Sequence, residues 1–306
     1  MSAPRAARND EAAIIGRFTA AFGRPSPPVV LGPGDDCALL RPRPGEVLAL
    51  TTDALVEGVH FSPAFSPADI GHKALAVNLS DLAAMGARPV AFLCALAFPE
   101  RWLPHLSGIA RGMARLARAH GCALAGGNVS RARELSVTIT AVGAVPVGQA
   151  LTRAGARPGH ALYLSGPLGG AAAGLRSQAP AHRSRQRRPR PRVALGLALR
   201  GVASAAIDVS DGLVRDLGRL LDASGVGAEV EPERIPRARG ATLDEALRGG
   251  EDYELLFAVP EGRAPALRAA AARCGARAPV RIGRVTRALG LAGLGPGESG
   301  GHDHFG

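Results

Sequence analysis

The chain carries, at Val47-Leu48-Ala49-Leu50-Thr51-Thr52-Asp53, an apolar run that ends in polar residues. The run Val47–Leu50 predicts a strand. Further on, Ser66-Pro67-Ala68-Asp69 is typical of a helix start, because it supplies a cap residue, a proline at the first position and an acid in the first turn. The helix that follows is expected from Ile70 to Met85, ending at Gly86. A strand that leads into a helix is the repeating unit of α/β folds.

The same alternation continues through the first half of the chain. The sequence predicts an amphipathic helix from Trp102 to His120 and a short buried strand from Cys122 to Ala125, which leads to Gly126-Gly127. Leu135 to Val145 is rich in β-branched residues and predicts a further strand. Pro146-Val147-Gly148 is interpreted as a domain junction. We therefore expect one domain at 1–147 and a second at 148–306.

Strands and helices also alternate in the second half of the chain. Ala161 to Ser165 is expected to be a strand, and the glycine-rich run 166–170 after it suits either a phosphate contact through backbone N–H groups or a tight turn. Ala205-Ala206-Ile207 predicts a strand that leads to Asp208, and a helix with a leucine-rich face is expected from Ser210. The fold class is therefore mixed α/β (α+β) in two domains.

The bulk composition narrows the function. The chain has 306 residues and a net charge of +11, but Lys73 is its single lysine, and six arginines crowd into Arg183–Arg192. We interpret that stretch as an exposed, mobile loop, so nucleic acid is not an expected partner. No apolar run approaches the roughly 18 residues of a membrane span. The first ten residues lack a secretory pattern, so a cytoplasmic location is expected.

Acidic residues gather where α/β proteins hold ligands. Most lie beside glycines, at strand ends or at helix starts: Asp35, Asp36, Asp53, Asp208, Asp211, Glu251 and Asp252. Asp81 lies within the helix expected from Ile70, one turn beyond Asn78 and on the same face. Adjacent buried acids repel one another, and a hard divalent cation relieves that cost. Mg²⁺ bound by carboxylates suits phosphoryl transfer. The chain lacks the phosphate-binding GxxxxGK[ST] run and the HRD and DFG motifs, so P-loop and protein-kinase sites are excluded.

Several longer strings resemble a known family. They are Gly34–Ala38, Thr51–Phe61 (TTDALVEGVHF), Lys73–Ala87 (KALAVNLSDLAAMGA), Leu151–Arg153, Ile207–Leu213 (IDVSDGL), Gly249–Leu255 (GGEDYEL) and Asp303–Phe305. Together and in this order they resemble the thiamine-monophosphate kinases, within the superfamily of aminoimidazole-ribonucleotide-synthetase-like proteins. The two longest strings are highly specific.

The resemblance implies an activity and a set of site residues. It implies transfer of phosphate from ATP to thiamine monophosphate with Mg²⁺, in a homodimer whose N-terminal domains share a β-barrel. The N-terminal domain would bind Mg-ATP and dimerise, and the C-terminal domain would complete the cleft. Carried over by position, the metal ligands are Asp36, Thr51, Thr52, Asp53, Asp81, Asn128, Asp208 and Asp211. Asp53, Asp81 and Asp208 would be catalytic, Gly127, Asn128, Arg153 and Ser210 would bind ATP, and His60, Glu251 and His302 would contact the substrate.

The chain departs from the family at a few positions. Asn128 replaces an aspartate, and its amide oxygen can bind a metal but brings no charge. His302 and His72 replace aromatic residues. These departures keep two alternatives open: a weakened or divergent ATP-binding member of the superfamily, or a nucleic-acid-binding protein without catalysis.

Overall fold

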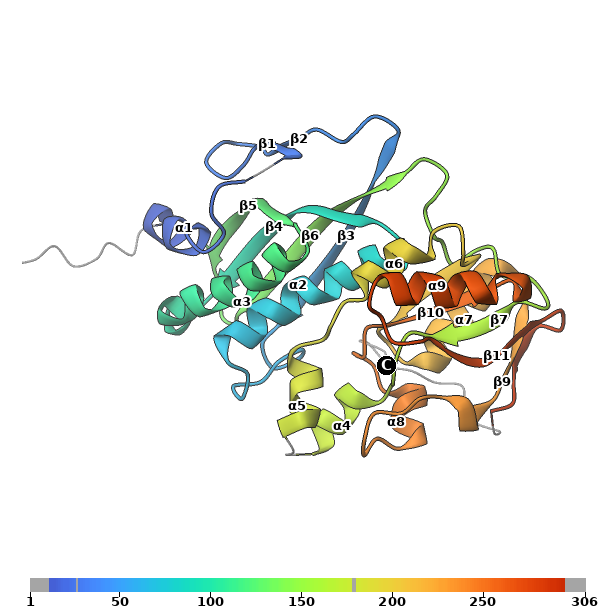
Figure 1. The fold of residues 1–306 in the computed structure, drawn as a ribbon. Coiled ribbons are helices and arrows are strands. Elements are labelled where there is room, and N and C mark those ends of the chain that lie inside the picture. The colour runs from blue at the N-terminus through green and yellow to red at the C-terminus, as the bar shows by residue number, and fades with distance from the viewer. Residues whose placement is uncertain (1–10, 26, 178–179, 295–306) are drawn as a thin grey trace, which may run out of the picture. The chain divides into compact units, whose positions relative to one another are not determined.

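The computed structural model describes residues 11–25, 27–177 and 180–294 (Figure 1). The chain divides into two compact units. The first unit contains the described parts of Met1–Pro44, Leu50–Asn78 and Pro89–Val142, and the second contains those of Gly45–Ala49, Leu79–Arg88 and Gly143–Gly306. The mixed α/β class in two parts is confirmed. The boundary between residues 147 and 148, and the roles assigned to the two domains, stay predictions.

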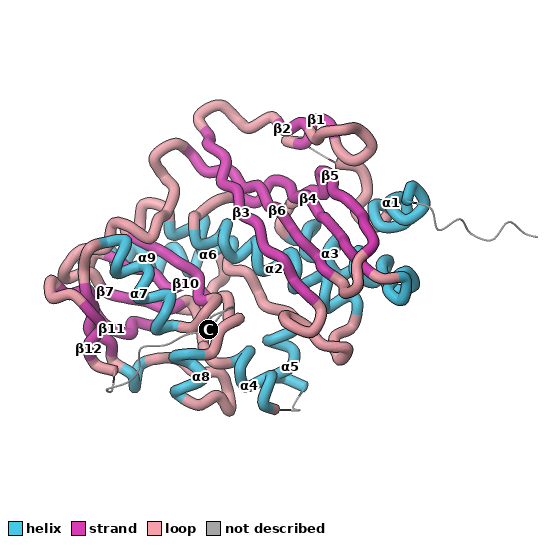
Figure 2. The backbone as a smooth tube through the Cα atoms, turned by 180° about the vertical axis from the view of Figure 1, so that it is seen from behind, coloured by secondary structure: helices cyan, strands magenta, loops and turns pink. Residues whose placement is uncertain are grey.

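The first unit is built on most of a sheet with the strand order β3-β6-β4-β5, of which residues 46–49, 88 and 143–146 belong to the second unit. The strands are β3 (Glu46–Val56), β6 (Ser136–Pro146), β4 (Arg88–Phe98) and β5 (Ala123–Arg131). Helices α2 (Pro67–Ala84) and α3 (Leu106–Ala119) cover one face, and Figure 2 shows the opposite face in front of them. The unit also contains α1 (Glu11–Thr19), β1 (Val29–Leu31), β2 (Leu39–Leu40) and the 3-10 helix η1 (Glu100–His105).

Helices α2 and α3 approach one another closely enough to need glycine. A Cβ at Gly71 would lie 1.9 Å from the carbonyl oxygen of Ile109, and one at Gly112 would lie 2.0 Å from that of Ala68. Neither backbone could tolerate a side chain there. The close approach leaves α2 almost wholly buried, including the fully buried Lys73 and Asn78.

The face of this sheet that α2 and α3 leave open is partly apolar. Leu48 and Leu50 on β3 are 40% and 67% exposed, and Leu93 on β4 is 41% exposed. Thr52 of β3 and Asn128 of β5 are also exposed. Strand β6 lies between β3 and β4 in this sheet. Three exposed leucines within one four-stranded sheet are unusual for a surface that faces water.

The second unit holds a six-stranded sheet with the order β12-β9-β11-β7-β10-β8. The pairs are antiparallel except for β12 with β9, which are parallel. The strands are β7 (Ala161–Leu164), β8 (Ala205–Val209), β9 (Gly227–Val230), β10 (Glu254–Val259), β11 (Val280–Thr286) and β12 (Gly290–Ala292). The edge strand β8 and its neighbour β10 are buried along their full length.

Helix α7 (Leu213–Ser224) supplies the main helical contribution to this unit's core. Its residues Leu213, Leu217, Leu220 and Leu221 pack with apolar residues of the sheet. The other helices are α4 (Gly170–Arg176), α5 (Pro180–Arg187), α6 (Val193–Leu199), α8 (Leu243–Arg248), α9 (Ala264–Arg273), η2 (Pro232–Arg234) and η3 (Glu261–Arg263). Helices α4 and α5 lie side by side in both views (Figures 1 and 2).

Three sequence-based expectations for local structure were wrong. The single helix from Trp102 to His120 is instead η1 followed by α3, with Pro104 inside the 3-10 turn. The helix expected from Ser210 begins at Leu213. The arginine stretch is not a loop throughout, because Arg183–Arg187 belongs to α5. In the described part of the chain, no helix is long and apolar enough to cross a membrane.

Candidate active site

The first unit carries two exposed groups of the expected ligands. Asp35 and Asp36 follow Gly34, whose φ of 120° favours glycine, and the backbone N–H of Asp36 donates to Oδ1 of Asp35 at 2.8 Å. Both acids are exposed. On β3, Thr52 Oγ1 donates to the carbonyl oxygen of Ile139 at 3.1 Å, and Asp53 beside it is exposed. These acids can therefore bind a ligand without first leaving a buried environment.

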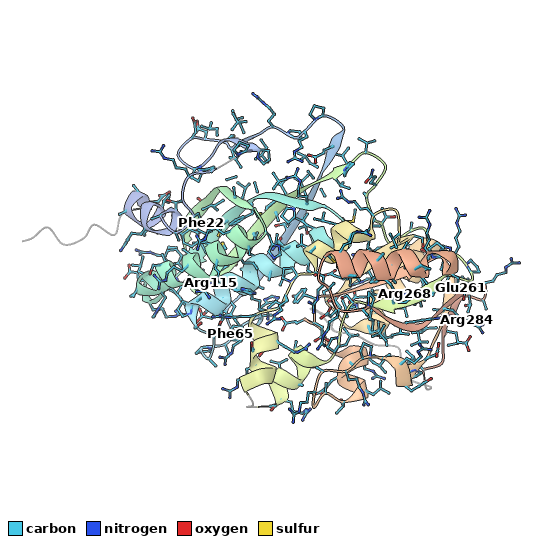
Figure 3. All side chains as sticks on the ribbon, in the orientation of Figure 1. Phe22, Phe65, Arg115, Glu261, Arg268 and Arg284 are labelled. Carbon is cyan, nitrogen blue, oxygen red and sulfur yellow. The ribbon has the colours of Figure 1, made fainter. Side chains whose placement is uncertain are left out.

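His60 lies in a tight turn after β3. Its Nδ1 accepts a hydrogen bond from the backbone N–H of Val56 at 3.1 Å. In the neutral ring the proton therefore sits on Nε2, which makes Nε2 a donor. Lys73 of α2, fully buried, donates from Nζ to the carbonyl oxygen of His60 at 2.9 Å. The ammonium also lies 5.5 Å from the ring centre of Phe65, which is labelled in Figure 3.

Glu57 connects the same turn to neighbouring residues through three hydrogen bonds. Its Oε2 accepts hydrogen bonds from the indole of Trp102, the backbone N–H of Leu135 and the guanidinium of Arg101, each at 3.0 Å. Burial opposes the charge of Glu57, but these donors outweigh burial and lower its pKa. The turn is thus held at Glu57 by these donors and at His60 by the Lys73 ammonium.

Helix α2 carries Asn78 and Asp81 one turn apart. Asn78 is fully buried, and its Nδ2 donates to the carbonyl oxygen of Ala74 at 3.0 Å. Its Oδ1 is buried too, yet no described residue donates to it. A buried amide oxygen of this kind favours a nearby donor or cation.

In the second unit, Asp208 at the end of β8 is the most buried of the expected ligands. It is 5% exposed, and its Oδ2 accepts a hydrogen bond from Ser80 Oγ at 2.6 Å. Ser80 directly precedes Asp81 on α2. The structure therefore brings the turn of α2 that bears Asp81 against the strand that bears Asp208.

The turn after β8 is organised by Asp216, a fully buried acid on α7. Its Oδ2 accepts the backbone N–H groups of Ser210 and Asp211, both at 2.9 Å. Its Oδ1 lies 2.8 Å from the guanidinium of Arg219, which also contacts Asp211 Oδ2 at 2.6 Å. Burial and the neighbouring Asp211 raise the pKa of Asp216, against the effect of these donors. The Asp216 side chain thus fixes the turn that precedes α7, which begins at Leu213.

Glu251 belongs to a strained turn. Glu251 and Tyr253 have φ angles of 66° and 52°, which side-chain-bearing residues rarely adopt. The N–H of Glu251 donates to the carbonyl oxygen of Ser210 at 2.7 Å, and that of Tyr253 to Val209 at 2.9 Å. These bonds place Glu251 next to Ser210. Strain of this kind tends to gather at functional sites.

Asp252, between the two strained residues, clamps the glycine-rich run to this turn. Its carboxylate accepts the N–H groups of Gly169, Gly170 and Ala171 at 2.5, 2.9 and 3.2 Å. Burial raises the pKa of Asp252 to about 6 in spite of these donors. Of the two interpretations of Gly169-Gly170, the phosphate contact is wrong for these N–H groups, because they bond to the chain's own carboxylate.

The arginine stretch is also fixed at its end. The guanidinium of Arg192 forms a two-pronged ion pair with Glu254, which is 2% exposed. Ser165 Oγ donates to the same carboxylate at 2.5 Å. Gln186 and Pro189 are buried. The expectation of a mobile loop was wrong because the stretch contributes a helix, buried side chains and an ion pair.

The remaining expected residues are less constrained. Gly127, Asn128 and Arg153 are exposed, and a Cβ at Gly127 would lie 2.0 Å from the carbonyl oxygen of Cys94. His302 lies outside the described residues. A pocket of about 450 Å³ adjoins β5, lined by Glu11, Ile14, Phe98, Glu100, Leu103, Val129, Ser130 and Arg131. Its lining includes none of the expected site residues.

The expected metal ligands are divided between the two units. Asp36 and Asp53 belong to the first, whereas Asp81 and Asp208 belong to the second, so their expected convergence stays a prediction. Among the described residues, no three His, Cys, Asp or Glu side chains form a group that could hold a metal ion.

Sequence reasoning missed Asp216 and Arg219, and it missed the positioning roles of Asp252, Glu57 and Lys73. All five contact turns or helices that carry expected site residues. Asp216 could have been found, because it is an acid three positions after Leu213 on the apolar face of its helix. The partners of Asp252 are about 80 residues away and leave no local signal.

Comparison with known proteins matches both halves of the chain. Residues 34–145 match the family described as AIR synthase related protein, N-terminal domain, and residues 157–293 match its C-terminal domain. The chain is 44% identical to thiamine-monophosphate kinase of Salmonella typhimurium over 76% of this chain and 77% of that protein. Thiamine-monophosphate kinase from Stenotrophomonas maltophilia, a crystal structure, is 41% identical with a TM-score of 0.83, covering 91% of this chain and 95% of that one. A structure described as AaThiL complexed with AMPPCP and TMP is 31% identical with a TM-score of 0.78, covering 100% of both chains.

The fold and the matched residues define the class: the chain belongs to the AIR synthase related proteins. The N-terminal and C-terminal family domains match consecutive parts of the chain, residues 34–145 and 157–293, and this order supports the assignment. Within the class it belongs to the thiamine-monophosphate kinases, since identities of 41–44% extend over most of the chain.

Proposed function

We propose that this chain transfers the γ-phosphate of ATP to thiamine monophosphate, giving ADP and thiamine diphosphate. One observation carries the proposal: the match to thiamine-monophosphate kinases runs through both units. The relative described with AMPPCP and TMP, an ATP analogue and the proposed acceptor, spans the whole chain.

In this proposal the chain's own residues position two anions. The Nε2–H of His60 donates to the substrate phosphate, because Nδ1 is already occupied by Val56. Glu251 contacts the substrate beside Ser210, and Ser210, Arg153 and Gly127-Asn128 contact ATP. Holding donor and acceptor phosphates together in line is the main task in phosphoryl transfer.

Mg²⁺ is the metal that the available ligands suit. The exposed carboxylates of Asp36 and Asp53, the threonine oxygens and the buried Asn78 Oδ1 are hard oxygen ligands. Mg²⁺ usually binds one or two carboxylates together with water and substrate phosphates, so a ready-made cage of three acids is not needed. When bound, the ion would neutralise charge on the phosphates.

The nucleic-acid alternative is the less supported one. It rested on Asn128 and on the arginine stretch, and within that stretch Arg192 pairs with Glu254 and Arg185 donates to the carbonyl oxygen of Pro167 at 3.3 Å. The weakened-enzyme alternative rested on Asn128, which is exposed and compatible with binding through its amide oxygen.

The proposal includes a homodimer and a cytoplasmic location. The exposed leucines 48, 50 and 93 on the open sheet face support the dimer, because a second copy would remove them from water. This face would form the shared β-barrel expected from the family. The cytoplasm is the compartment that supplies ATP.

A turnover assay tests the proposal. The purified chain with Mg-ATP and thiamine monophosphate is expected to form thiamine diphosphate. Asp53→Asn is expected to abolish turnover, since it removes charge where the cation must meet the phosphates. Near-normal activity in that variant would remove Asp53 from the site, and the absence of product from the unsubstituted chain would reject the function.

A further inference from the structure

Asp211, one of the metal ligands expected from the family resemblance, has a cation of its own in this chain. Arg219 NH1 lies 2.6 Å from Asp211 Oδ2, and the Asp211 side chain is 21% exposed. Arg219 lies two turns further along, on α7, so a short, rigid piece of the chain carries both partners. The contact is at the short end of the range for charge-assisted hydrogen bonds.

Arg219 also forms an ion pair with Asp216, which it would lose if it turned away from Asp211. The same NH1 lies 2.8 Å from Oδ1 of Asp216, which is 0% exposed. The other oxygen of Asp216 accepts the N–H groups of Ser210 and Asp211. Arg219 is the cation that pairs with the buried Asp216 carboxylate, and removing one partner of a buried pair is strongly destabilising.

A divalent ion is also disfavoured on the remaining oxygen of Asp211. An ion there would lie next to the guanidinium, and two cations at such a distance repel one another. The need for charge compensation, which would draw a metal to Asp211, is already met.

We propose that Arg219 replaces a divalent cation at Asp211, so that this chain binds one metal ion fewer than the ligand set implied by its family. The guanidinium keeps the turn Ser210-Asp211 in place without a metal. The inference rests on the proposed function for the identity of the other ligands, but it concerns Asp211 alone.

Counting bound Mn²⁺ tests the inference. The full chain, saturated with AMPPCP, is titrated with Mn²⁺, and bound ions per chain are counted by electron paramagnetic resonance. Asp211→Asn is expected to bind as many ions as the unsubstituted chain. Arg219→Gln is expected to bind one ion more, and the double variant Arg219→Gln/Asp211→Asn is expected to return to the original number.

Two controls separate the effect from general loss of charge or fold. Arg234→Gln removes an exposed arginine that pairs with Glu231 at 3.3 Å, with the same i,i+3 spacing as Arg219 and Asp216. It should leave the number of bound Mn²⁺ ions unchanged. Arg219→Lys retains a cation and should also keep the original count. Circular dichroism reports whether each variant is folded.

Either of two results would overturn the inference: loss of an ion in Asp211→Asn alone, or no extra ion in folded Arg219→Gln. The first needs no substitution of Arg219, so it decides the matter even where Arg219→Gln does not fold. Turnover is measured separately. Failure to form thiamine diphosphate would reject the proposed function, whereas the ion counts alone decide the role of Arg219.

Discussion

Asp252 is a carboxylate that the fold holds in an unfavourable place for a charge. Burial raises its pKa to about 6, and the nearby Glu254 adds to this effect, while three backbone N–H groups oppose it. The clamp that it forms joins the glycine-rich run to the strained turn of Glu251. A residue whose charge is only partly favoured is a source of pH dependence near neutrality.

We expect this carboxyl to lower stability as pH rises from about 4 to 6. In that window the folded chain holds the proton more tightly than the unfolded chain, so the free energy of unfolding falls with rising pH. The contribution should be roughly 2–3 kcal/mol, at about 1.4 kcal/mol per pKa unit. Urea unfolding of the unsubstituted chain and of Asp252→Asn, at several pH values, measures it.

The difference between those two unfolding free energies should change across pH 4–6 and then become constant. Asp244→Asn, at a side chain that is 75% exposed on α8, controls for the loss of one surface carboxylate. Parallel curves for the unsubstituted chain and Asp252→Asn would contradict the expectation.

The residues proposed to bear chemistry were chosen from the sequence, whereas the contacts that hold them in place could not be. Asp36, Asp53, Asp208 and Glu251 stand in specific strings, so a pattern indicates them. Asp252 was visible as an acid in such a string, but its partners Gly169–Ala171 become neighbours only through the fold. A contact across that separation depends on strand order, which no local pattern encodes.

At the scale of elements, the arginine stretch shows how composition can mislead. A segment rich in arginine and proline suggests solvent exposure, yet α5 and the pair Arg192–Glu254 are integral to the second unit. Glu254 opens β10, a fully buried strand that pairs with β7 on one side and with the edge strand β8 on the other. The ion pair therefore connects the end of the stretch to the unit's core.

Arg192→Met is expected to lower the free energy of unfolding by about 2–3 kcal/mol, because Glu254 would stay buried with Ser165 as its main donor. Arg190→Met, at an exposed arginine two residues earlier, should change it by about 0.5 kcal/mol or less. Denaturant unfolding of both variants checks the pair. Equal effects would show that the Arg192 contact adds nothing beyond surface charge.

The boundaries of the helices and strands also show the limit of prediction from sequence. The apolar period correctly indicated β3, α2 and α7, since burial dictates that period. It misplaced the start of α7, where Ser210 and Asp211 form a turn held by the Asp216 side chain, and it merged η1 with α3. Caps and 3-10 turns depend on single hydrogen bonds, which leave little trace in hydropathy.

For the whole molecule, the open sheet face of the first unit is the feature with the largest consequence for assembly. Leu50→Arg is expected to convert the proposed dimer to a monomer, because a charged side chain would have to be buried at the interface. Light scattering coupled to gel filtration should then give half the mass of the unsubstituted chain.

Leu289→Arg is the matched control, since Leu289 is 78% exposed in the second unit. It should leave the mass unchanged. A monomer for the unsubstituted chain would reject the dimer, and a dimer for Leu50→Arg would place the interface elsewhere. The two-part fold was predictable from the order of the strings, whereas the exposure of these leucines required the structure, because an alternating strand does not tell which face is covered.

The burial of Lys73 also decides how this molecule meets reagents that attack amines. The chain has one lysine, and its ammonium is 0% exposed and bonded to the carbonyl oxygen of His60. Acylating reagents therefore find no lysine side chain on the folded surface, however many arginines that surface carries. The Nζ of Lys73 becomes reactive when α2 separates from the turn of His60, which makes the extent of its acylation a count of local opening events. Because the basic residues of this chain are arginines apart from Lys73 and the histidines, Lys73 is the single lysine that can report such opening, and it is bonded to the residue proposed to contact the substrate.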